Sequence, residues 1–458
     1  MKHRFAGRPP RWFHPEDMSE RFILDRETGE VTPPDRLLVE GSTEDDPIRL
    51  YASGDIIWER GLMTVLPGKP PEHPLGAMRE LWSDGDIVFA QLETCFGPER
   101  GEMWEPGKRI SYLTDPRLLP HFLHGGFNLA CQASNHTMDH GLAPIDYTRE
   151  KLREAGIAVS GSGANLAAAR EPAIVELRGK RVALLSYATD DQVSNAQPDR
   201  PGNAPFQREL VIDDVRAARR NADFTMVSVH KGREFVYFPS PEHQADCRAI
   251  ADAGADIILG HHPHFLQGLE WRQRDDGRQC LICYSLGSLL VDYEPHLSKY
   301  ELELFRRSQR NNFVARVDLD EHGVVGLRLT PVRQTKDWSV RLESEQERQE
   351  TFDIVEWSSH PLNHLEDGRP KPCRKFWVSG WAYLAIQYPS IWLHLRRRPS
   401  YIGNALRWFF REETFRLQWG AIFAREVPGW LMGLRGGLIS LARLPLRLLK
   451  RLLGRGGK

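Results

Sequence analysis

The chain contains few cysteines. Only six of its 458 residues are cysteine, too few to hold a chain of this length together by disulfides, so a small disulfide-rich secreted scaffold is excluded. One Cys-x-x-Cys pair, Cys280 and Cys283, lies in an apolar run that we interpret as a strand. Because residues i and i+3 of a strand point to opposite faces, we do not expect this pair to share a metal or to act in redox chemistry.

The sequence also lacks the long apolar segments that are typical of export or membrane insertion. Its first 30 residues contain no apolar core of the kind that a secretory signal needs. The longest apolar stretch, residues 376–393, is interrupted by Gly380, Gln387 and Pro389. It therefore falls short of the roughly 20 apolar residues of a spanning helix. We expect a cytoplasmic protein without a signal peptide.

The net charge is close to zero, at −1, but it is unevenly distributed along the chain. Residues 374–458 hold 16 Lys and Arg against three acids, a net +13, which leaves −14 for residues 1–373. The same segment holds six of the 13 tryptophans. The overall content of 41% apolar and 27% charged residues excludes a disordered or collagen-like chain.

The basic segment ends in a pattern that is typical of an amphipathic helix. At 100° per residue, leucines share one face and basic residues lie opposite. The leucines are Leu434, Leu438, Leu441, Leu448, Leu449 and Leu452, and the basic residues are Arg443, Arg447, Lys450 and Arg451. We expect residues 374–458 to form a helical tail that binds an anionic membrane surface, as a peripheral contact on the inner leaflet. Docking of this tail on the acidic remainder of the chain is the alternative.

Short apolar runs alternate with segments of helical spacing in the first 335 residues. The runs, which we interpret as strands, are residues 48–52, 87–90, 127–133, 182–188, 224–229, 257–259 and 281–286. Residues 144–155 and 241–253 have the spacing of helices. This alternation predicts a layered α/β fold.

Four segments are expected along the chain. Residues 1–46, which are polar and rich in proline and arginine, form an N-terminal arm, and residues 47–335 form the α/β domain. Residues 336–373 are polar and contain scattered prolines, so we expect a linker or a peripheral wrap. Residues 374–458 are the basic, tryptophan-rich tail.

Polar residues that can bind metals or move protons follow five of the predicted strands. They are Asp55, Glu93, Asn135, His136, His230, His261, His262 and His264. Taken singly, a polar residue after a strand is more typical of a helix cap or a turn. The carboxyl ends of strands meet at one edge of an open α/β sheet, so we expect these residues to lie close together. So many carboxylates and imidazoles are costly to bury without a cation.

The donor set itself indicates the kind of metal site. Carboxylates, an amide oxygen and imidazoles suit Zn, Mn, Fe or Mg better than a soft thiolate site does. About six donors exceed the needs of one tetrahedral ion and suit a pair of ions roughly 3.5–4 Å apart, which activates water and clamps a phosphoryl group. The residues therefore predict a hydrolase with two divalent ions.

These stretches, in their order along the chain, resemble the CapA family, which is linked to poly-γ-glutamate capsule synthesis and belongs to the calcineurin-like metallophosphoesterase superfamily. The resemblance covers about residues 48–335. The stretches are Gly54-Asp55, Gln91-Leu92-Glu93, Ser134-Asn135-His136 with Asp139, His230-Lys231-Gly232 with Glu234, Gly260-His261-His262-Pro263-His264, and Tyr284-Ser285-Leu286-Gly287-Ser288.

The resemblance implies a four-layer α/β/β/α metallophosphoesterase-like sandwich with a metal centre at the loop ends of its two sheets. It implies His136 as proton donor to the leaving group and Arg60 as an assisting cation. His261 can exchange roles with either neighbouring histidine. The implied metal ligands are Asp55, Glu93, Asn135, His230, His262 and His264, with Glu93 in a bridging position.

The chain departs from the family pattern at positions around these ligands. Ile57 stands where the wider superfamily has a histidine. Gln91 replaces an asparagine, Ser134 replaces the first asparagine of an Asn-Asn-His stretch, Lys231 replaces a tryptophan, and Ser288 replaces an asparagine. The candidate metal ligands survive these changes, whereas the residues that would face a substrate do not. The substrate is therefore the least determined part of the prediction.

Three functions are compatible with these observations. The leading hypothesis is a metal-dependent hydrolase of the phosphoesterase type that acts on an anionic polymer or a phosphoester in capsule or exopolymer metabolism. The second is a phosphoesterase for a lipid-linked or nucleotide substrate. The third is a non-catalytic scaffold that recruits polymer or membrane to a synthase complex. We expect no nucleic-acid partner, because the basic residues lie among tryptophans and leucines without a recognisable binding module.

Overall fold

The computed structural model describes residues 22–32, 47–98, 108, 110–189, 193–292, 310–363, 365–366 and 369–370. The chain divides into two compact units, residues 1–373 and 374–458, and every described residue lies in the first. The expected basic tail and its membrane contact therefore fall outside the described residues. Within the described part, no helix combines the length and the apolar character that a bilayer crossing requires.

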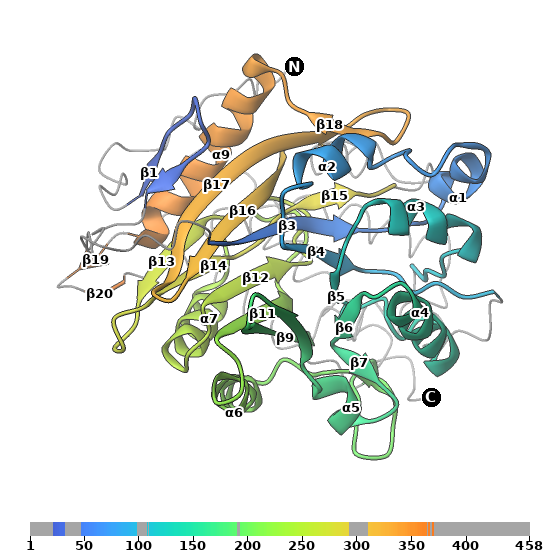
Figure 1. The fold of residues 1–458 in the computed structure, drawn as a ribbon, viewed down its shortest axis with the longest axis horizontal. Coiled ribbons are helices and arrows are strands. Elements are labelled where there is room, and N and C mark those ends of the chain that lie inside the picture. The colour runs from blue at the N-terminus through green and yellow to red at the C-terminus, as the bar shows by residue number, and fades with distance from the viewer. Residues whose placement is uncertain are drawn as a thin grey trace, which may run out of the picture. The chain divides into compact units, whose positions relative to one another are not determined.

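A 14-stranded mixed β-sheet forms the centre of the first unit (Figure 1). Its main path runs β6-β5-β4-β3-β16-β17-β14-β12-β11-β9-β8, while β13 pairs with β14, β15 with β3, and β18 with β17. The strands are β3 (Ile48–Ile56), β4 (Ile87–Leu92), β5 (Leu129–Cys131), β6 (Ala158–Ser160), β8 (Ala173–Leu177), β9 (Lys180–Ala188), β11 (Phe224–His230), β12 (Ile257–His261), β13 (Leu269–Gln273), β14 (Gln279–Cys283), β15 (Ser288–Leu290), β16 (Asn312–Asp320), β17 (Gly323–Gln334) and β18 (Val340–Leu342).

The sheet folds into two halves that face each other. The halves join where β14 meets β17 through a single residue pair, Gln279 with Gly323. At the other end of the path, β6 lies against β8 and β9. Leu50 and Phe89 from one half share a buried apolar cluster with Met226 and Leu259 from the other half. The main core therefore lies between the two halves.

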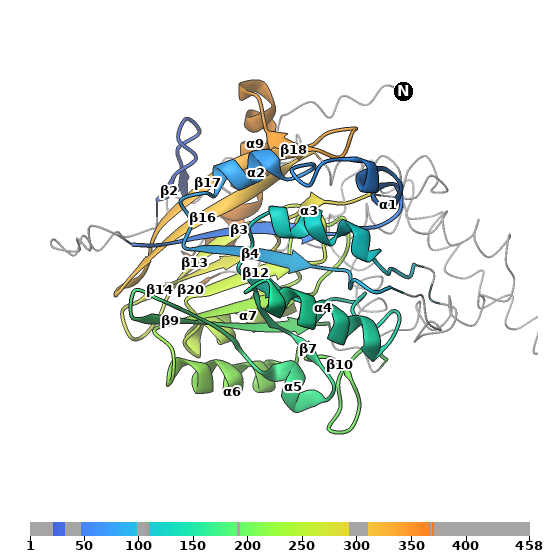
Figure 2. The ribbon, with the colours of Figure 1, turned by 45° about the vertical axis from the view of Figure 1, so that its right-hand side comes forward.

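Helices cover the outer face of each half, and α2 and α6 lie on opposite sides of the strands (Figure 2). The first half carries α1 (Gly61–Val65), α2 (Gly76–Leu81), α3 (Leu119–His124) and α4 (Leu142–Glu154), and the second carries α6 (Arg208–Arg219) and α7 (Pro241–Asp252). In the first half, Met78 and Phe122 of the helices pack on Val88 and Ala130 of the strands. The layers run helix, sheet, sheet, helix, which confirms the expected α/β sandwich.

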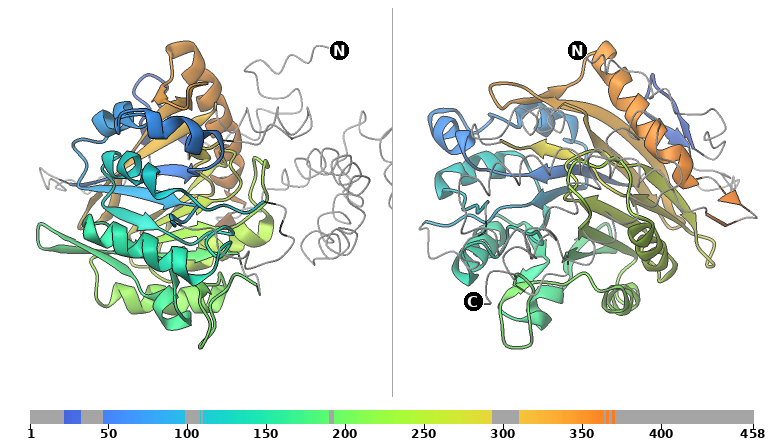
Figure 3. Two further views of the ribbon diagram at one scale, coloured as in Figure 1. Left: turned by 90° about the vertical axis from the view of Figure 1, so that its right-hand side faces the viewer. Right: turned by 180° about the vertical axis from the view of Figure 1, so that it is seen from behind.

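Residues 336–363 differ from the expected linker or peripheral wrap. They contain β18 and the 19-residue helix α9 (Glu345–Asn363), which packs against β13 and β17. Seen from behind, this helix runs alongside the strands (Figure 3). Phe352 and Val355 of α9 belong to the core between the two halves. The remaining surface of α9 carries many charged residues, which is why the sequence predicted a polar linker here.

The described part of the N-terminal arm is also integrated into the first unit. Its strands β1 (Ile23–Leu24) and β2 (Val31–Thr32) form a hairpin beside β17. Phe22 is buried in the main core. Arg26 at the turn donates hydrogen bonds to Asp353 and Glu356 of α9. Residues 22–32 thus pack on the domain, whereas the expected arm included them in a separate segment.

Close backbone approach positions the loops around the end of β3. A Cβ atom at Gly54 would lie 2.4 Å from the carbonyl oxygen of Gly287, so only glycine fits there. Just after Gly287, β15 pairs in parallel with β3, with Ser288 opposite Asp55. The Tyr284–Ser288 stretch is therefore held against the strand that carries the first candidate ligand.

Candidate metal centre

The strand ends bring the candidate residues to one edge of the two-layered core. Asp55 lies near the end of β3, Glu93 directly follows β4, and His230 ends β11. β11 and β12 are parallel neighbours with His230 opposite His261, and the loop after β12 carries His262 and His264. Asn135 lies in the loop after β5. Because parallel strands end at the same edge, these five loops converge here as the sequence predicted.

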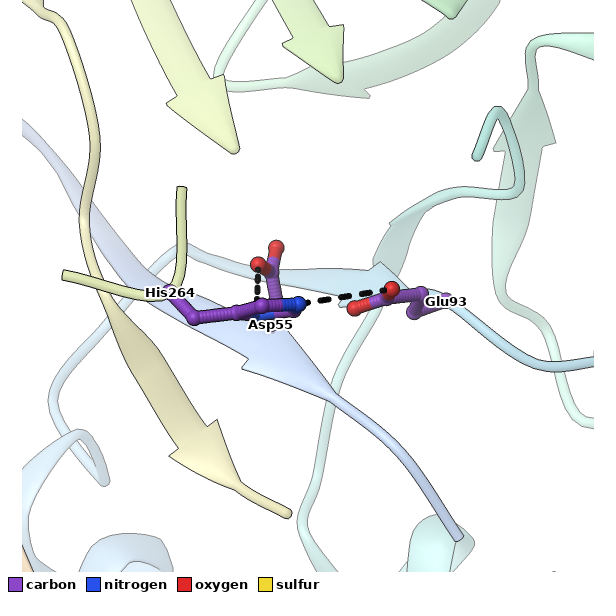
Figure 4. Close-up of side chains that lie close together, drawn as sticks. All are labelled: Asp55, Glu93 and His264. Atoms are coloured by element: carbon purple, nitrogen blue, oxygen red, sulfur yellow. Dashed lines mark ion pairs between the residues drawn. The ribbon is translucent and has the colours of Figure 1, made fainter. Parts of the chain in front are cut away.

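Asp55, Glu93 and His264 form a buried cluster. One ligand atom from each lies within 4.8 Å of the other two, a spacing that can hold a metal ion. The His264 ring lies between the two carboxylates (Figure 4). Its Nδ1 is 3.0 Å from Oδ2 of Asp55, and its Nε2 is 3.9 Å from Oε1 of Glu93.

His230 and Asn135 adjoin this cluster. Nε2 of His230 lies 2.8 Å from Oδ1 of Asn135 and 3.8 Å from Oε1 of Glu93. Nδ1 of the same ring lies 4.0 Å from Oδ1 of Asp55. The ring of His262 is 4.9 Å from that of His230, centroid to centroid. All six residues predicted as metal ligands therefore lie around one centre, and their roles as ligands stay a prediction.

Asp55 accepts hydrogen bonds on both of its carboxylate oxygens. Its Oδ1 accepts from Nδ1 of His261 at 3.0 Å, and its Oδ2 accepts from the backbone N–H of His262 at 3.1 Å. Burial alone would raise the pKa of Asp55, but hydrogen bonds from His261 and His264 outweigh it and hold the pKa well below the usual range. Asp55 is therefore ionised at neutral pH.

The pKa of Glu93 is shifted upward, whereas that of Asp55 is shifted downward. It is 1% exposed, and burial raises its pKa to about 8. Its Oε2 has no hydrogen-bond partner among the described residues. Although burial alone would lower the pKa of His264, the neighbouring Glu93 and Asp55 carboxylates raise it to about 9. A buried carboxylate without a donor is what a bound cation would satisfy, so the residues fit a divalent metal.

The loop that carries the last two histidines is held in a strained conformation. His262 has φ of 89° and His264 has φ of 57°, values that cost non-glycine residues roughly 1–3 kcal/mol each. The bond from His262 to Asp55 and the bond from the Phe235 N–H to the Pro263 carbonyl hold the loop in place. Such strain is typical of sites where side chains are aimed at a ligand.

His136 lies beside the centre and has its own partners. Its Nδ1 lies 2.7 Å from Oδ2 of Asp139, and the tilted Tyr112 ring packs against it at 4.2 Å between centroids. Oδ2 of Asp139 also accepts the Tyr112 N–H, and its Oδ1 pairs with Lys108. Burial is the main cause that lowers the pKa of His136 to about 4. The Asp139 carboxylate therefore orients this imidazole.

Arg60, the second residue predicted to be catalytic, is placed next to Tyr112. Its Nη2 donates to the Tyr112 hydroxyl at 2.8 Å, and its Nη1 donates to the Asp292 carbonyl at 3.0 Å. Its backbone has a positive φ of 62°. Tyr112 thus contacts both Arg60 and His136. This placement indicates that Arg60 supports the ring that packs on His136.

Several residues that contact the centre were not assigned roles from sequence. Asp139 stands three positions after His136, which is a detectable signal for a hydrogen-bonding pair. Gln91 Nε2 lies 3.4 Å from Nδ1 of His230, and Ser288 Oγ lies 3.1 Å from Nδ1 of His264. Tyr112 has no local sequence signal, because its position depends on a loop that returns from a distant part of the chain.

Comparison with known proteins gives related sequences. The sequence model of the family described as "Bacterial capsule synthesis protein PGA_cap" matches residues 49–293. The chain is 34% identical over 256 residues to the capsule biosynthesis protein CapA of Bacillus anthracis, covering 54% of this chain and 61% of that protein. It is 26% identical over 250 residues to the PGA biosynthesis protein CapA of Bacillus subtilis strain 168, covering 54% and 64%.

The chain thus spans less than two thirds of the length of either of these relatives. Among solved structures, the calcineurin-like phosphoesterase YfkN of Bacillus subtilis is 11% identical, with 68% of this chain and 98% of that chain covered and a TM-score of 0.35. A TM-score this low carries no functional argument. The family match covers more than half of the chain and includes every candidate ligand. The chain therefore belongs to the bacterial capsule synthesis protein family PGA_cap.

Proposed function

We propose that the chain is a divalent-metal-dependent hydrolase of the phosphoesterase type that acts in the synthesis of a capsule or a related anionic exopolymer such as poly-γ-glutamate. Family membership and the names of the related CapA proteins support the biological role. The hydrolase activity rests mainly on one observation, the buried Glu93 carboxylate that faces two imidazoles and has an oxygen without a hydrogen-bond partner in the described structure.

The residues that would hold the metal supply carboxylate, amide and imidazole donors. They are Asp55, Glu93, Asn135, His230, His262 and His264. This set suits Mn, Fe, Zn or Mg. Such an ion, when bound, polarises a phosphoryl oxygen and lowers the pKa of water. The sequence predicts two ions, and this number stays a prediction that the ratio of metal to protein tests.

His136 has the geometry for moving a proton. Because the Asp139 carboxylate accepts from Nδ1, the nitrogen that exchanges a proton with a leaving group is Nε2. With its pKa lowered to about 4, chiefly by burial, the ring is neutral at pH 7 and takes up a proton at Nε2 before it donates one. Packing against Tyr112, which Arg60 holds through the phenol hydroxyl, keeps the ring in position.

Hydrolysis assays on matched variants test this proposal. The substrates are p-nitrophenyl phosphate, a nucleotide, a lipid-linked phosphoester and poly-γ-glutamate, each with added Mn²⁺. We expect the native chain to hydrolyse at least one of them, and Glu93→Gln to reduce kcat/KM by at least 100-fold because the metal is lost. Glu176→Gln, an exposed carboxylate on β8, is the control and should keep full activity.

Absence of turnover on all four substrates by the metal-loaded native chain would contradict the proposal. Retention of the ion together with that absence would favour the non-catalytic scaffold. Preference for the lipid-linked ester or the nucleotide over the polymer would place the chain in a different pathway, while the metal-dependent chemistry would stand.

A further inference from the structure

The loop between β11 and α7 carries a carboxylate, Glu234, that has no role in the site described above. Backbone hydrogen bonds on both sides of Glu234 join this loop to the loop after β12. The Lys231 N–H donates to the His261 carbonyl at 3.1 Å. The Phe235 N–H donates to the Pro263 carbonyl at 2.7 Å. Glu234 is therefore held beside the loop that carries two of the candidate metal ligands.

The Glu234 carboxylate acts electrostatically on residues from three other loops around the centre. Burial lowers the pKa of His262, and Glu234 is the largest influence that opposes this shift. Burial is also the largest influence on the pKa of Glu93, His136 and His264, and the same carboxylate acts to raise all three values. These residues belong to the loops after β4, β5 and β12. A charge that acts on all of them lies among these loops rather than on the outer surface.

Glu234 is not neutralised by a cation of the chain. It is partly exposed, and it makes no hydrogen bond or ion pair with any residue that the structure describes. Lys108, whose charge also acts on Glu93 and His136, is paired with Asp139. Nor does Glu234 belong to the buried cluster that can hold a metal ion. The site thus contains a negative charge that is available to a substrate.

We propose that Glu234 is a specificity-determining residue that binds a primary ammonium group of the substrate. An unpaired carboxylate repels anionic groups, and it does so more strongly when it is partly removed from water. The same carboxylate attracts a cation and forms charge-assisted hydrogen bonds with it. The inference rests on the proposed function and refines it, because it names a second group that the substrate carries near the bond that is cleaved.

Two kinds of substrate within the proposed function carry such an ammonium group. In poly-γ-glutamate every residue has a free carboxylate, but only one end of the chain has a free amino group. Glu234 therefore repels internal segments of this polymer and attracts its amino end. A phosphoester with an aminoalkyl group, such as phosphoethanolamine, presents the same ammonium next to a phosphoryl group. The shared chemistry is a primary ammonium close to the group that is hydrolysed.

Binding of matched phosphonates to the full, metal-loaded chain tests the inference. Aminoalkylphosphonates with two to four carbons are compared with alkylphosphonates that carry a methyl group in place of the ammonium, and neither series has a phosphoester bond to hydrolyse. Calorimetric titration gives Kd for the native chain, Glu234→Gln and the exposed control Glu176→Gln. We expect the native chain and the control to bind the best aminoalkylphosphonate about 10- to 100-fold more tightly than its methyl counterpart.

The Glu234→Gln variant separates recognition of the ammonium from a structural role. We expect it to lose the preference for the aminoalkylphosphonate, and to bind the alkylphosphonate at least as tightly as the native chain because a like charge is removed. A purely structural role would weaken the binding of both ligands. Elemental analysis should show the same metal content as in the native chain, because Glu234 lies outside the metal-binding cluster. The comparison of the two phosphonate series on the native chain needs no variant.

Hydrolysis by the native chain distinguishes the two sources of the ammonium. Preference for tri-γ-glutamate over its N-acetylated form identifies the amino end of the polymer, and preference for phosphoethanolamine over propyl phosphate identifies an aminoalkyl phosphoester. Equal Kd values for the two phosphonate series, loss of metal in Glu234→Gln, or no preference within either pair of substrates would each overturn the inference and leave the proposed function standing. A metal-loaded native chain that binds neither phosphonate series would refute the inference together with the phosphoesterase function.

Discussion

At the scale of single residues, buried histidines away from the centre determine how the fold responds to acid. His243 on α7 is 3% exposed, and its ring lies edge-on to Phe206 and Tyr284. Burial, with a smaller contribution from Lys231, lowers the pKa of His243 to about 3. The folded protein therefore keeps this ring neutral in mildly acidic solution, whereas the unfolded chain protonates it near pH 6.5.

The sign of the pH dependence follows from this difference. Between about pH 6.5 and pH 3 the unfolded state binds a proton at His243 that the folded state does not, so the free energy of unfolding falls as the pH falls. The loss at this residue is about 1.4 kcal/mol per pH unit below 6.5. We expect the free energy of unfolding of His243→Phe, which keeps a ring in place, to fall by about 2 kcal/mol less than that of the native chain between pH 7 and pH 5.

Urea unfolding of both proteins at the two pH values measures this difference. The same substitution at His322, which is exposed at the turn between β16 and β17, is the control and should leave the pH dependence unchanged. An equal acid response of His243→Phe and the native chain would show that His243 does not contribute to it.

At the scale of elements, helix α9 covers the outer edge of strand β13. The Leu269 N–H donates to Ser359 Oγ at 2.9 Å, and the Trp271 N–H donates to Asn363 Oδ1 at 3.1 Å. Asn363 Nδ2 donates in return to the Leu269 carbonyl at 2.8 Å. β13 pairs with β14 on its other side. Side chains of the helix therefore take the place of a further strand and protect an edge that could otherwise pair with another chain.

Removal of the Asn363 side chain tests this edge protection. We expect Asn363→Ala to lower the free energy of unfolding by about 1–3 kcal/mol, because a backbone donor and a backbone acceptor of a buried strand lose their partner. Equilibrium unfolding in urea gives the value. Gln346→Ala, on the exposed first turn of α9, should change stability by no more than about 0.5 kcal/mol. Equal effects of the two variants would argue against a role for α9 at this edge.

At the scale of the whole molecule, the charge differs strongly between residues 1–373 and 374–458. This difference predicts that the protein binds an anionic membrane through residues 374–458. The tail lies outside the described residues, and its expected binding to an anionic membrane is our proposal. The unit 1–373 is compact by itself. We expect the full chain to float with liposomes that contain phosphatidylserine, and a chain ending at residue 373 to stay in the aqueous fraction, because the +13 segment is removed.

High salt and neutral liposomes are the controls for this experiment. Raising the salt concentration should weaken flotation of the full chain, since exposed charges are screened beyond a Debye length. Equal flotation of both chains, or none of the full chain on anionic liposomes, would contradict membrane binding by the tail.

Local pattern was sufficient to predict the strands that precede the candidate ligands and the loops that carry those ligands. The strands around Ile87, Met226 and Ile258 were visible as short apolar runs, and Asp55 and His230 lie close to the carboxyl ends of their strands. Helix α9 was not predicted, because its many charged residues obscure the periodic pattern of the apolar face that carries Phe352. Some of these charged residues pair with distant residues such as Arg26. Ion pairs between residues more than 300 positions apart have no signal in local sequence.

The sequence by itself determined the alternation of strands and helices in the α/β domain, the residues at the strand ends and the family, because each depends on neighbouring residues or on a run of motifs. Only the tertiary structure decided which nitrogen of His230 and His264 faces Asp55 and which faces Glu93. Ring orientation is set by Ser288, Gln91 and the backbone of the His262 loop. These groups meet only when two half-sheets from distant parts of the chain close on each other.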